Sequence, residues 1–131
     1  MTRISLAGQP HDLQLPDGVI YVGRAYGGTK GHPLRNPHAV GKPCRARCHC
    51  KTPDCTACRP CDDGTNIHSR DESLDLCHDH LAQHPDLLDQ AAVLVEDRWT
   101  LACRCPLGQP CHIDVLTEIA EAVINGCWEA A

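Results

Sequence analysis

Cysteines are concentrated in the middle of the chain, where six of the eleven fall within the stretch from residue 44 to residue 61. They are Cys44, Cys48, Cys50, Cys55, Cys58 and Cys61. Cysteines at such density serve mainly as disulfide partners or as metal ligands. The two C-x-x-C spacings that join Cys55, Cys58 and Cys61 allow one backbone turn to direct two thiolates at a single ion. The spacing therefore predicts bound metal, with zinc as the expected ion.

The spacing leaves the grouping of these ligands open. Structural zinc takes four sulfur or imidazole ligands in a tetrahedron, and Cys58, Cys61 and His68 supply three of them in chain order. The fourth is Cys55, Cys44 or a residue from near the C-terminus. A separate four-thiolate site would then consist of Cys44, Cys48, Cys50 and Cys55. We expect one or two zinc ions, and disulfides or an iron–sulfur cluster are the alternatives.

A second group of candidate ligands lies near the C-terminus. Cys103 and Cys105 alternate along a predicted strand and so share one face, while Cys111 and His112 begin the last predicted helix. Three interpretations stay open: a metal site formed by these residues, a catalytic Cys111 whose pKa is lowered by the helix N-terminus, and plain structural cysteines. Adjacent helical residues point about 100° apart, which counts against convergence of Cys111 and His112 on one ion.

A glycine-rich stretch, residues 23–31, follows the most apolar strand candidate. Open α/β sheets place ligand sites at such strand ends. Four residues are candidates to surround the phosphate of a nucleotide or sugar: Gly23, Arg24, Asn36 and Asp114. The alternative of equal weight is an ion pair between Arg24 and Asp114 that joins strand to helix.

Charge is distributed unevenly along a chain whose net charge is -5. No acidic residue occurs between Asp17 and Asp54, although this stretch holds seven of the twelve basic residues. They are Arg24, Lys30, Arg35, Lys42, Arg45, Arg47 and Lys51. These cations either balance metal-bound thiolates or attract the phosphates of a nucleotide or nucleic acid.

The 131 residues predict a single α/β domain, 1–131, with a Cys-rich metal-binding insert at 40–68. The first residues lack the apolar stretch of a signal peptide, and no run approaches the roughly 20 apolar residues that span a membrane. We therefore expect a soluble cytoplasmic protein with no membrane partner. Its reducing compartment would favour metal binding over disulfides.

Hydrophobic periodicity predicts a small parallel or mixed sheet flanked by helices. Expected strands span residues 3–7, 19–23 and 98–105, and expected helices span 70–83, 86–95 and 111–124. The strand at 19–23 is apolar almost throughout, so we expect both its faces to be covered. Ser69 and Glu72 form a predicted capping box at the first helix.

Several other histidines and cysteines lie outside these candidate sites. His78, His80 and His84 form a His-rich stretch at the first predicted helix, and we expect them at the solvated surface. The alternative is a metal shared by His80 and His84, which are four residues apart. Cys77 is expected in the core, and Cys127 is expected to be partly buried after the last helix.

Four segments together resemble the DUF4326 family of domains of unknown function. They are VIYVGR (19–24), LRNPH (34–38), SRDESLDLCHDHLAQHP (69–85) and LACRCPLGQPCHIDVLTEIA (101–120). In that family a YVGR strand precedes a Gly-Asn-Pro-Phe type of turn, an acidic helix and a closing C-x-C…CHGDVL element. Here Arg35-Asn36-Pro37-His38 occupies the place of that turn. The resemblance implies a small α/β domain, often of actinobacterial or phage origin, and no particular reaction.

Three functions follow as hypotheses. The leading one is a zinc-binding accessory protein that contacts nucleotides or nucleic acid. The second is an enzyme that acts on a nucleoside or nucleotide, with Cys111 at its site. The third is a protein-interaction or phage structural module in which zinc folds a loop that binds a protein partner.

Overall fold

The computed structural model describes residues 3–9, 14–24, 31–44, 55–61, 64–105 and 108–127. The elements follow the expected order along the chain. They are β1 (Arg3–Ser5), β2 (Val19–Tyr21), the short 3-10 helix η1 (Arg59–Cys61), α1 (Arg70–Ala82), α2 (Pro85–Glu96), β3 (Thr100–Cys103) and α3 (His112–Ile124). The predicted fold class, a small α/β domain, is confirmed.

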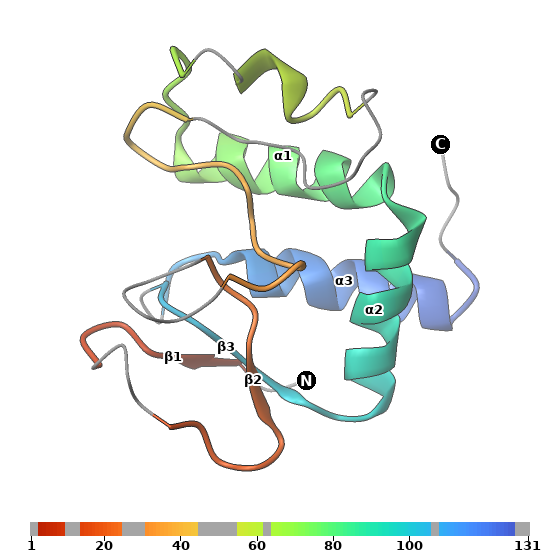
Figure 1. Ribbon diagram of the computed structural model, residues 1–131. Helices are drawn as coiled ribbons and strands as arrows, with labels where there is room; N and C mark the ends of the chain where they lie inside the picture. Colours follow the sequence, from red (N-terminus) through yellow and green to blue (C-terminus); the bar gives the residue numbers. More distant parts are fainter. Residues whose placement is uncertain are drawn as a thin grey trace.

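The three strands form one open parallel sheet in the order β1-β3-β2 (Figure 1). Ile4 of β1 lies opposite Ala102, and Ile20 of β2 lies opposite Leu101. Because β3 is the central strand, the residues that follow it emerge in the middle of the carboxyl edge of the sheet. This edge is where ligand sites occur in open parallel sheets.

The burial of β2 differs from expectation. All three of its residues are only half-buried, because β2 is an edge strand and not a central one. Full burial is reached at Val22, whose N–H donates to the carbonyl of Ala102 at 3.0 Å. The prediction that both faces of residues 19–23 are covered is therefore wrong, and the central position belongs to β3, where Leu101 and Cys103 are buried.

The helix boundaries arise from local sequence as predicted. The N–H of Glu72 donates to Ser69 Oγ at 3.2 Å, and the N–H of Ser69 donates to Glu72 Oε1 at 3.2 Å, so the capping box is confirmed. Pro85 stands at the start of α2, where its missing N–H costs nothing. Gly126, with a φ of +70°, follows the C-cap of α3 in a left-handed conformation that favours glycine.

The main core lies between the sheet and the three helices. Figure 1 shows α1 and α3 crossing the view one above the other, with α2 beside them. Leu81, Leu101 and Leu116 are fully buried there, and Cys77 joins them as expected. Cys127 is exposed, so its expected partial burial is wrong; it lies beyond the C-cap, past the last packed turn.

The described part of the insert, residues 40–44, 55–61 and 64–68, lies over α1. Backbone bridges pair Val40 with His68 and Pro43 with Ile67. A second buried cluster forms beneath these bridges, packed against Leu76 of α1; it consists of Ala39, Cys44, Cys55, Ala57, Cys58 and Cys61. Alanine and cysteine are the only apolar residues of this cluster, so hydrophobic burial alone stabilises it little.

The described helices contain no segment that is both long and apolar enough to cross a membrane.

Replacement of Leu116 by alanine tests the main core. The side chain is fully buried on α3, so Leu116→Ala is expected to lower the free energy of unfolding by about 2–5 kcal/mol. Urea denaturation at fixed metal content measures this loss. Val93→Ala is the matched control, because Val93 is 53% exposed and its truncation is expected to change stability by less than about 0.5 kcal/mol. Equal losses from the two variants would contradict the described core.

Candidate metal centres

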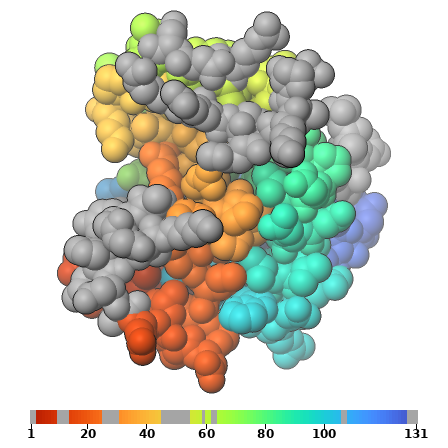
Figure 2. Space-filling view, in the orientation of Figure 1, coloured from red at the N-terminus to blue at the C-terminus, as the bar shows by residue number. Residues whose placement is uncertain are grey.

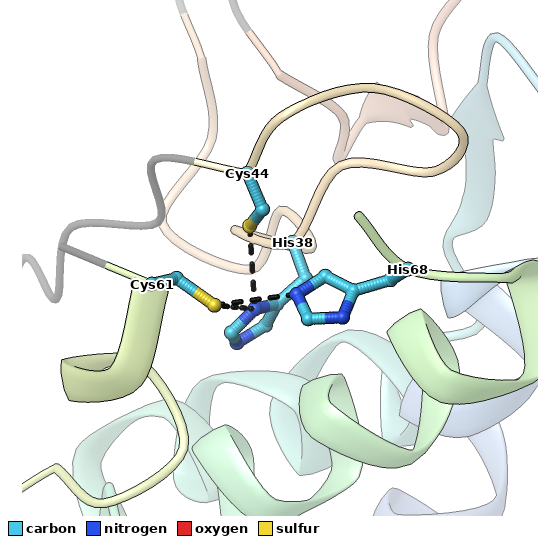
Figure 3. Close-up of side chains that lie close together, drawn as sticks. All are labelled: His38, Cys44, Cys61 and His68. Carbon is cyan, nitrogen blue, oxygen red and sulfur yellow. Dashed lines mark hydrogen bonds between the residues drawn. The ribbon is translucent and has the colours of Figure 1, made fainter. Parts of the chain in front are cut away.

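Four buried side chains converge beneath the insert and form the first cluster: His38, Cys44, Cys61 and His68. Their ligand atoms all lie within 4.8 Å of one another, and Figure 3 shows them directed at a common point. The Nδ1 of His38 lies 3.6 Å from Cys44 Sγ and 3.7 Å from Cys61 Sγ, and His68 Nε2 lies 3.2 Å from Cys61 Sγ. This arrangement can hold a metal ion.

His38 is positioned by a network that includes two of the predicted ligand-binding residues. Asn36 Oδ1 accepts from the His38 N–H at 2.9 Å, and Asn36 Nδ2 donates to Ser73 Oγ at 2.8 Å. The Ser73 hydroxyl in turn donates to the carbonyl of His38 at 2.9 Å. Arg24 donates to the carbonyls of Asn36 and His38. The turn is thereby fixed to both β2 and α1.

The other ligands of the first cluster also contact neighbouring polar groups. Asn66 Nδ2 donates to Cys61 Sγ at 3.7 Å, and the carbonyl of Asn66 accepts from the N–H of Cys44 at 2.8 Å. Glu72 Oε2 lies 3.9 Å from His68 Nδ1, the ring nitrogen that faces away from Cys61. Partners of this kind orient metal ligands and fix the tautomer of a histidine.

A second cluster lies at the end of α1 and consists of Cys55, Cys58, His80 and His84. His80 Nδ1 is 3.7 Å from Cys55 Sγ and 3.3 Å from Cys58 Sγ, and the ligand atoms of Cys55, His80 and His84 lie within 4.8 Å of one another. His84 Nδ1 lies 2.5 Å from the carbonyl of His80. A proton on that nitrogen leaves Nε2 with a lone pair for a metal.

The prediction that His80 and His84 lie at the surface is wrong, since both are buried. His80 lies on α1 and His84 is the N-cap of α2. Both lie beside Cys55 of the insert, whose placement helical periodicity alone does not give. His78 is partly exposed, with 43% of its side chain accessible.

His38 lies between the two clusters. Its Nε2 is 3.7 Å from Cys58 Sγ, on the side of the ring opposite to Cys44 and Cys61. Burial, followed by the nearby His68 and Arg24, lowers the pKa of His38 to about 4. The imidazole is therefore neutral at pH 7, as a metal ligand must be.

The third cluster consists of Cys103, Cys105 and Cys111, whose sulfurs lie within 4.8 Å of one another, with His112 beside them. Cys111 Sγ is 3.3 Å from Cys103 Sγ and 3.5 Å from His112 Nδ1. The expected 100° divergence of Cys111 and His112 does not arise. Cys111 is the N-cap of α3, with extended angles of φ -138° and ψ 156°, so it is not a helical residue.

The protonation of the third cluster does not favour Cys111 as a nucleophile. Hydrogen bonds with Cys103 and Cys105, together with burial, raise the pKa of Cys111. Hydrogen bonds from Cys103, Cys111 and His112 lower the pKa of Cys105. The stable thiolate is thus Cys105, which is half-buried, whereas Cys111 is fully buried.

A cavity of 390 Å³ opens at the carboxyl ends of β2 and β3. Figure 2 shows the surface hollowed at the left edge of the view, beneath the yellow segment near residue 40. Four cations line the cavity: Arg24, Lys42, Arg70 and Arg104. No acidic residue is found among the described residues that line it. His38 of the first cluster and Cys105 and His112 of the third also contribute to its walls.

The predicted phosphate-binding residues are only partly brought together. Gly23, Arg24 and Asn36 line the cavity, and a Cβ at Gly23 would lie 2.7 Å from the ring atom Cε1 of Tyr21. Asp114 lies elsewhere, since it accepts from the N–H of Cys111 at 3.0 Å and pairs with Arg3 at 3.4 Å. The expected ion pair between Arg24 and Asp114 is therefore wrong.

The predicted ligands of the insert are regrouped. Cys61 and His68 join His38 and Cys44, whereas Cys58 lies next to His80. Cys48 and Cys50 fall outside the described residues, as do residues 25–30 of the glycine-rich stretch and three predicted cations, Arg45, Arg47 and Lys51.

His38 was not among the predicted ligands, and a metal shared by His80 and His84 was only the lesser alternative. One available indication concerned His38, which stands where the resembled family has an aromatic residue, in a chain whose insert is unusually rich in cysteine. A histidine gained together with cysteines is the substitution that a Cys/His metal site requires.

Comparison with known proteins gives one match. The family model described as "Domain of unknown function (DUF4326)" matches residues 8–122. Neither the curated proteins nor the solved structures that were compared contain a match.

Alkylation separates Cys77 from Cys127, the two described cysteines that lie outside all three clusters. Burial raises the pKa of Cys77 to about 12, so its thiol stays protonated at pH 8 and inaccessible to iodoacetamide. Cys127 is exposed and is expected to react in the native protein. Peptide mapping by mass spectrometry measures both sites, with urea-unfolded protein as the control in which both react. Modification of native Cys77 at the rate of Cys127 would contradict the structure.

Proposed function

This chain belongs to the DUF4326 family, and we propose from its geometry that it is a zinc-binding domain whose ions hold the insert onto α1. The observation that carries the proposal is the first cluster. Its four buried ligands come from separate places in the chain, namely the turn at His38, the segment at Cys44, the end of η1 at Cys61 and the residue His68 near the start of α1.

The distances within the clusters fit zinc. Tetrahedral zinc with Zn–S near 2.3 Å and Zn–N near 2.0–2.1 Å places each sulfur about 3.5 Å from each nitrogen. In the first cluster three of the four sulfur–nitrogen pairs are separated by 3.6, 3.7 and 3.2 Å. Two thiolates with two imidazoles form a donor set typical of zinc, and both insert clusters have this composition.

Metal coordination would supply the stability that the apolar residues of the described part of the insert do not provide. Its buried cluster contains cysteine and alanine but no large aliphatic side chain of its own, and ordering each residue costs about 1–2 kcal/mol of backbone entropy. Apparent zinc-binding free energies in zinc-finger peptides are about 10–16 kcal/mol, which is of the size required. Disulfides do not supply it among the described cysteines, all of which are free.

Metal analysis of two histidine variants tests this function. His38→Ala removes a buried ligand, and the variant is expected to lose one equivalent of zinc after dialysis against a chelator that the wild type withstands. His78→Ala, on the same protein's exposed surface, is expected to keep all its zinc. Native mass spectrometry counts the ions in each protein. Zinc retention by His38→Ala equal to that of the wild type would refute the first site.

A second function, binding of a nucleotide or another phosphate-bearing ligand, is supported by the cavity. Its 390 Å³ is within the range of small-molecule sites, and its four cations face no carboxylate among the described lining residues. Arg24 and Arg104 already donate to backbone carbonyls. Lys42 makes no hydrogen bond or ion pair with a described residue, so its ammonium remains able to bind an anion.

Calorimetric titration with ATP and with pyrophosphate tests this second function. Lys42→Gln is expected to weaken binding about tenfold, because a charge-assisted hydrogen bond contributes about 1.5–3 kcal/mol. Arg98→Gln removes the same charge from an exposed position outside the cavity and is expected to leave the affinity unchanged. Equal effects of the two variants, or no binding at low salt, would exclude a cavity site. Binding of random DNA or RNA in place of ATP would indicate a nucleic-acid surface instead.

A further inference from the structure

The third cluster lies apart from the insert, where the central strand ends and the last helix begins. It shares no ligand with the first or second cluster. We propose that Cys103, Cys105, Cys111 and His112 bind a third metal ion, which fastens β3 to α3 and forms part of the wall of the cavity.

The three sulfurs converge from distinct positions of the backbone. Cys103 ends β3, Cys105 follows two residues later, and Cys111 precedes α3. Their sulfurs lie within 4.8 Å of one another, and those of Cys103 and Cys111 are 3.3 Å apart. Cys103 and Cys111 are fully buried, while Cys105 is half-buried and faces the cavity. One ion placed among the three sulfurs could contact all of them.

His112 is oriented as a fourth ligand. Its Nε2 lies 2.9 Å from the carbonyl of Val22, and a carbonyl can only accept, so the ring proton resides on Nε2. The lone pair of Nδ1 then faces Cys111 Sγ at 3.5 Å. Metal-ligating histidines commonly donate their second ring N–H to a backbone carbonyl in this way. The hydrogen bond also connects the site to the residue that follows β2.

Positive groups surround the sulfurs. The Arg3 guanidinium hydrogen-bonds with Cys103 and is close to Cys111, and the N–H of Ile113 donates to the Cys111 sulfur. Asp114 accepts from the N–H of Cys111 and from Arg3, which fixes both. These contacts place a guanidinium and backbone N–H groups beside sulfurs that would carry negative charge when bound to a divalent ion.

A metal accounts for all four side chains, whereas a disulfide does not. A bond between Cys103 and Cys111 would require their sulfurs to approach to about 2.05 Å, and it would leave Cys105 and His112 Nδ1 with no role. Three thiolates and one imidazole form a Cys₃His donor set, which is typical of zinc. Because Cys105 and His112 line the cavity, the ion would lie beside a ligand bound there.

Zinc counting with Cys105→Ser tests the third site, with Cys127→Ser as the matched control at an exposed cysteine. Native mass spectrometry is expected to find one zinc fewer in Cys105→Ser than in the wild type and no change in Cys127→Ser. The double variant Cys105→Ser/His38→Ala is expected to lack two ions, because the two sites share no ligand. His112→Cys is expected to keep the third ion, since a thiolate can replace the imidazole.

Alkylation of the wild type provides a measurement that does not depend on a variant's folding. Cys103, Cys105 and Cys111 are expected to resist iodoacetamide in the zinc-loaded protein and to react at least tenfold faster after chelation. Full zinc retention by Cys105→Ser, or a Cys103–Cys111 disulfide in protein purified anaerobically, would overturn the third site. If His38→Ala still loses zinc in that case, the proposed zinc site at His38 is retained and only the proposal of a third site is rejected.

Discussion

We propose that coordination of metal by buried cysteine and histidine is the interaction on which this structure depends. The domain proper has a conventional core of leucine and isoleucine between the sheet and α1–α3. The described part of the insert has no such aliphatic core, and the residues buried there are cysteine, histidine and alanine. Four imidazole and thiolate groups within 4.8 Å of one another would lie buried with weak mutual hydrogen bonds in the absence of an ion. A bound ion would crosslink the separate chain segments that carry these four groups.

The first cluster and the cavity are linked through one network. Arg24 extends from the end of β2 to the carbonyls of Asn36 and His38, and Ser73 of α1 bonds to the same turn. Movement of the His38 turn would therefore shift Arg24, a residue of the cavity wall. The proposed third ion stands at the opposite wall, where His112 contacts Val22. Ions bound at these two places would thus fix the shape of the cavity from two sides.

Local features of the fold were predictable because local residues determine them. The capping box at Ser69, the start of α2 at Pro85 and the strand before Cys105 depend on neighbours in sequence. The cysteines of the insert were recognisable as candidate ligands from their spacing alone. The burial of His80 and His84 was not recognisable, because it depends on where the insert folds. Likewise, Cys111 and His112 converge only because Cys111 caps α3 in an extended conformation.

Anomalous diffraction at the zinc absorption edge, on crystals of protein purified without added metal, tests the central claim most directly. A strong anomalous peak is expected at the centre of His38, Cys44, Cys61 and His68, about 2.3 Å from each sulfur and 2.0–2.1 Å from each nitrogen. No peak at that position, or continuous density for an S–S bond between Cys44 and Cys61, would contradict that claim.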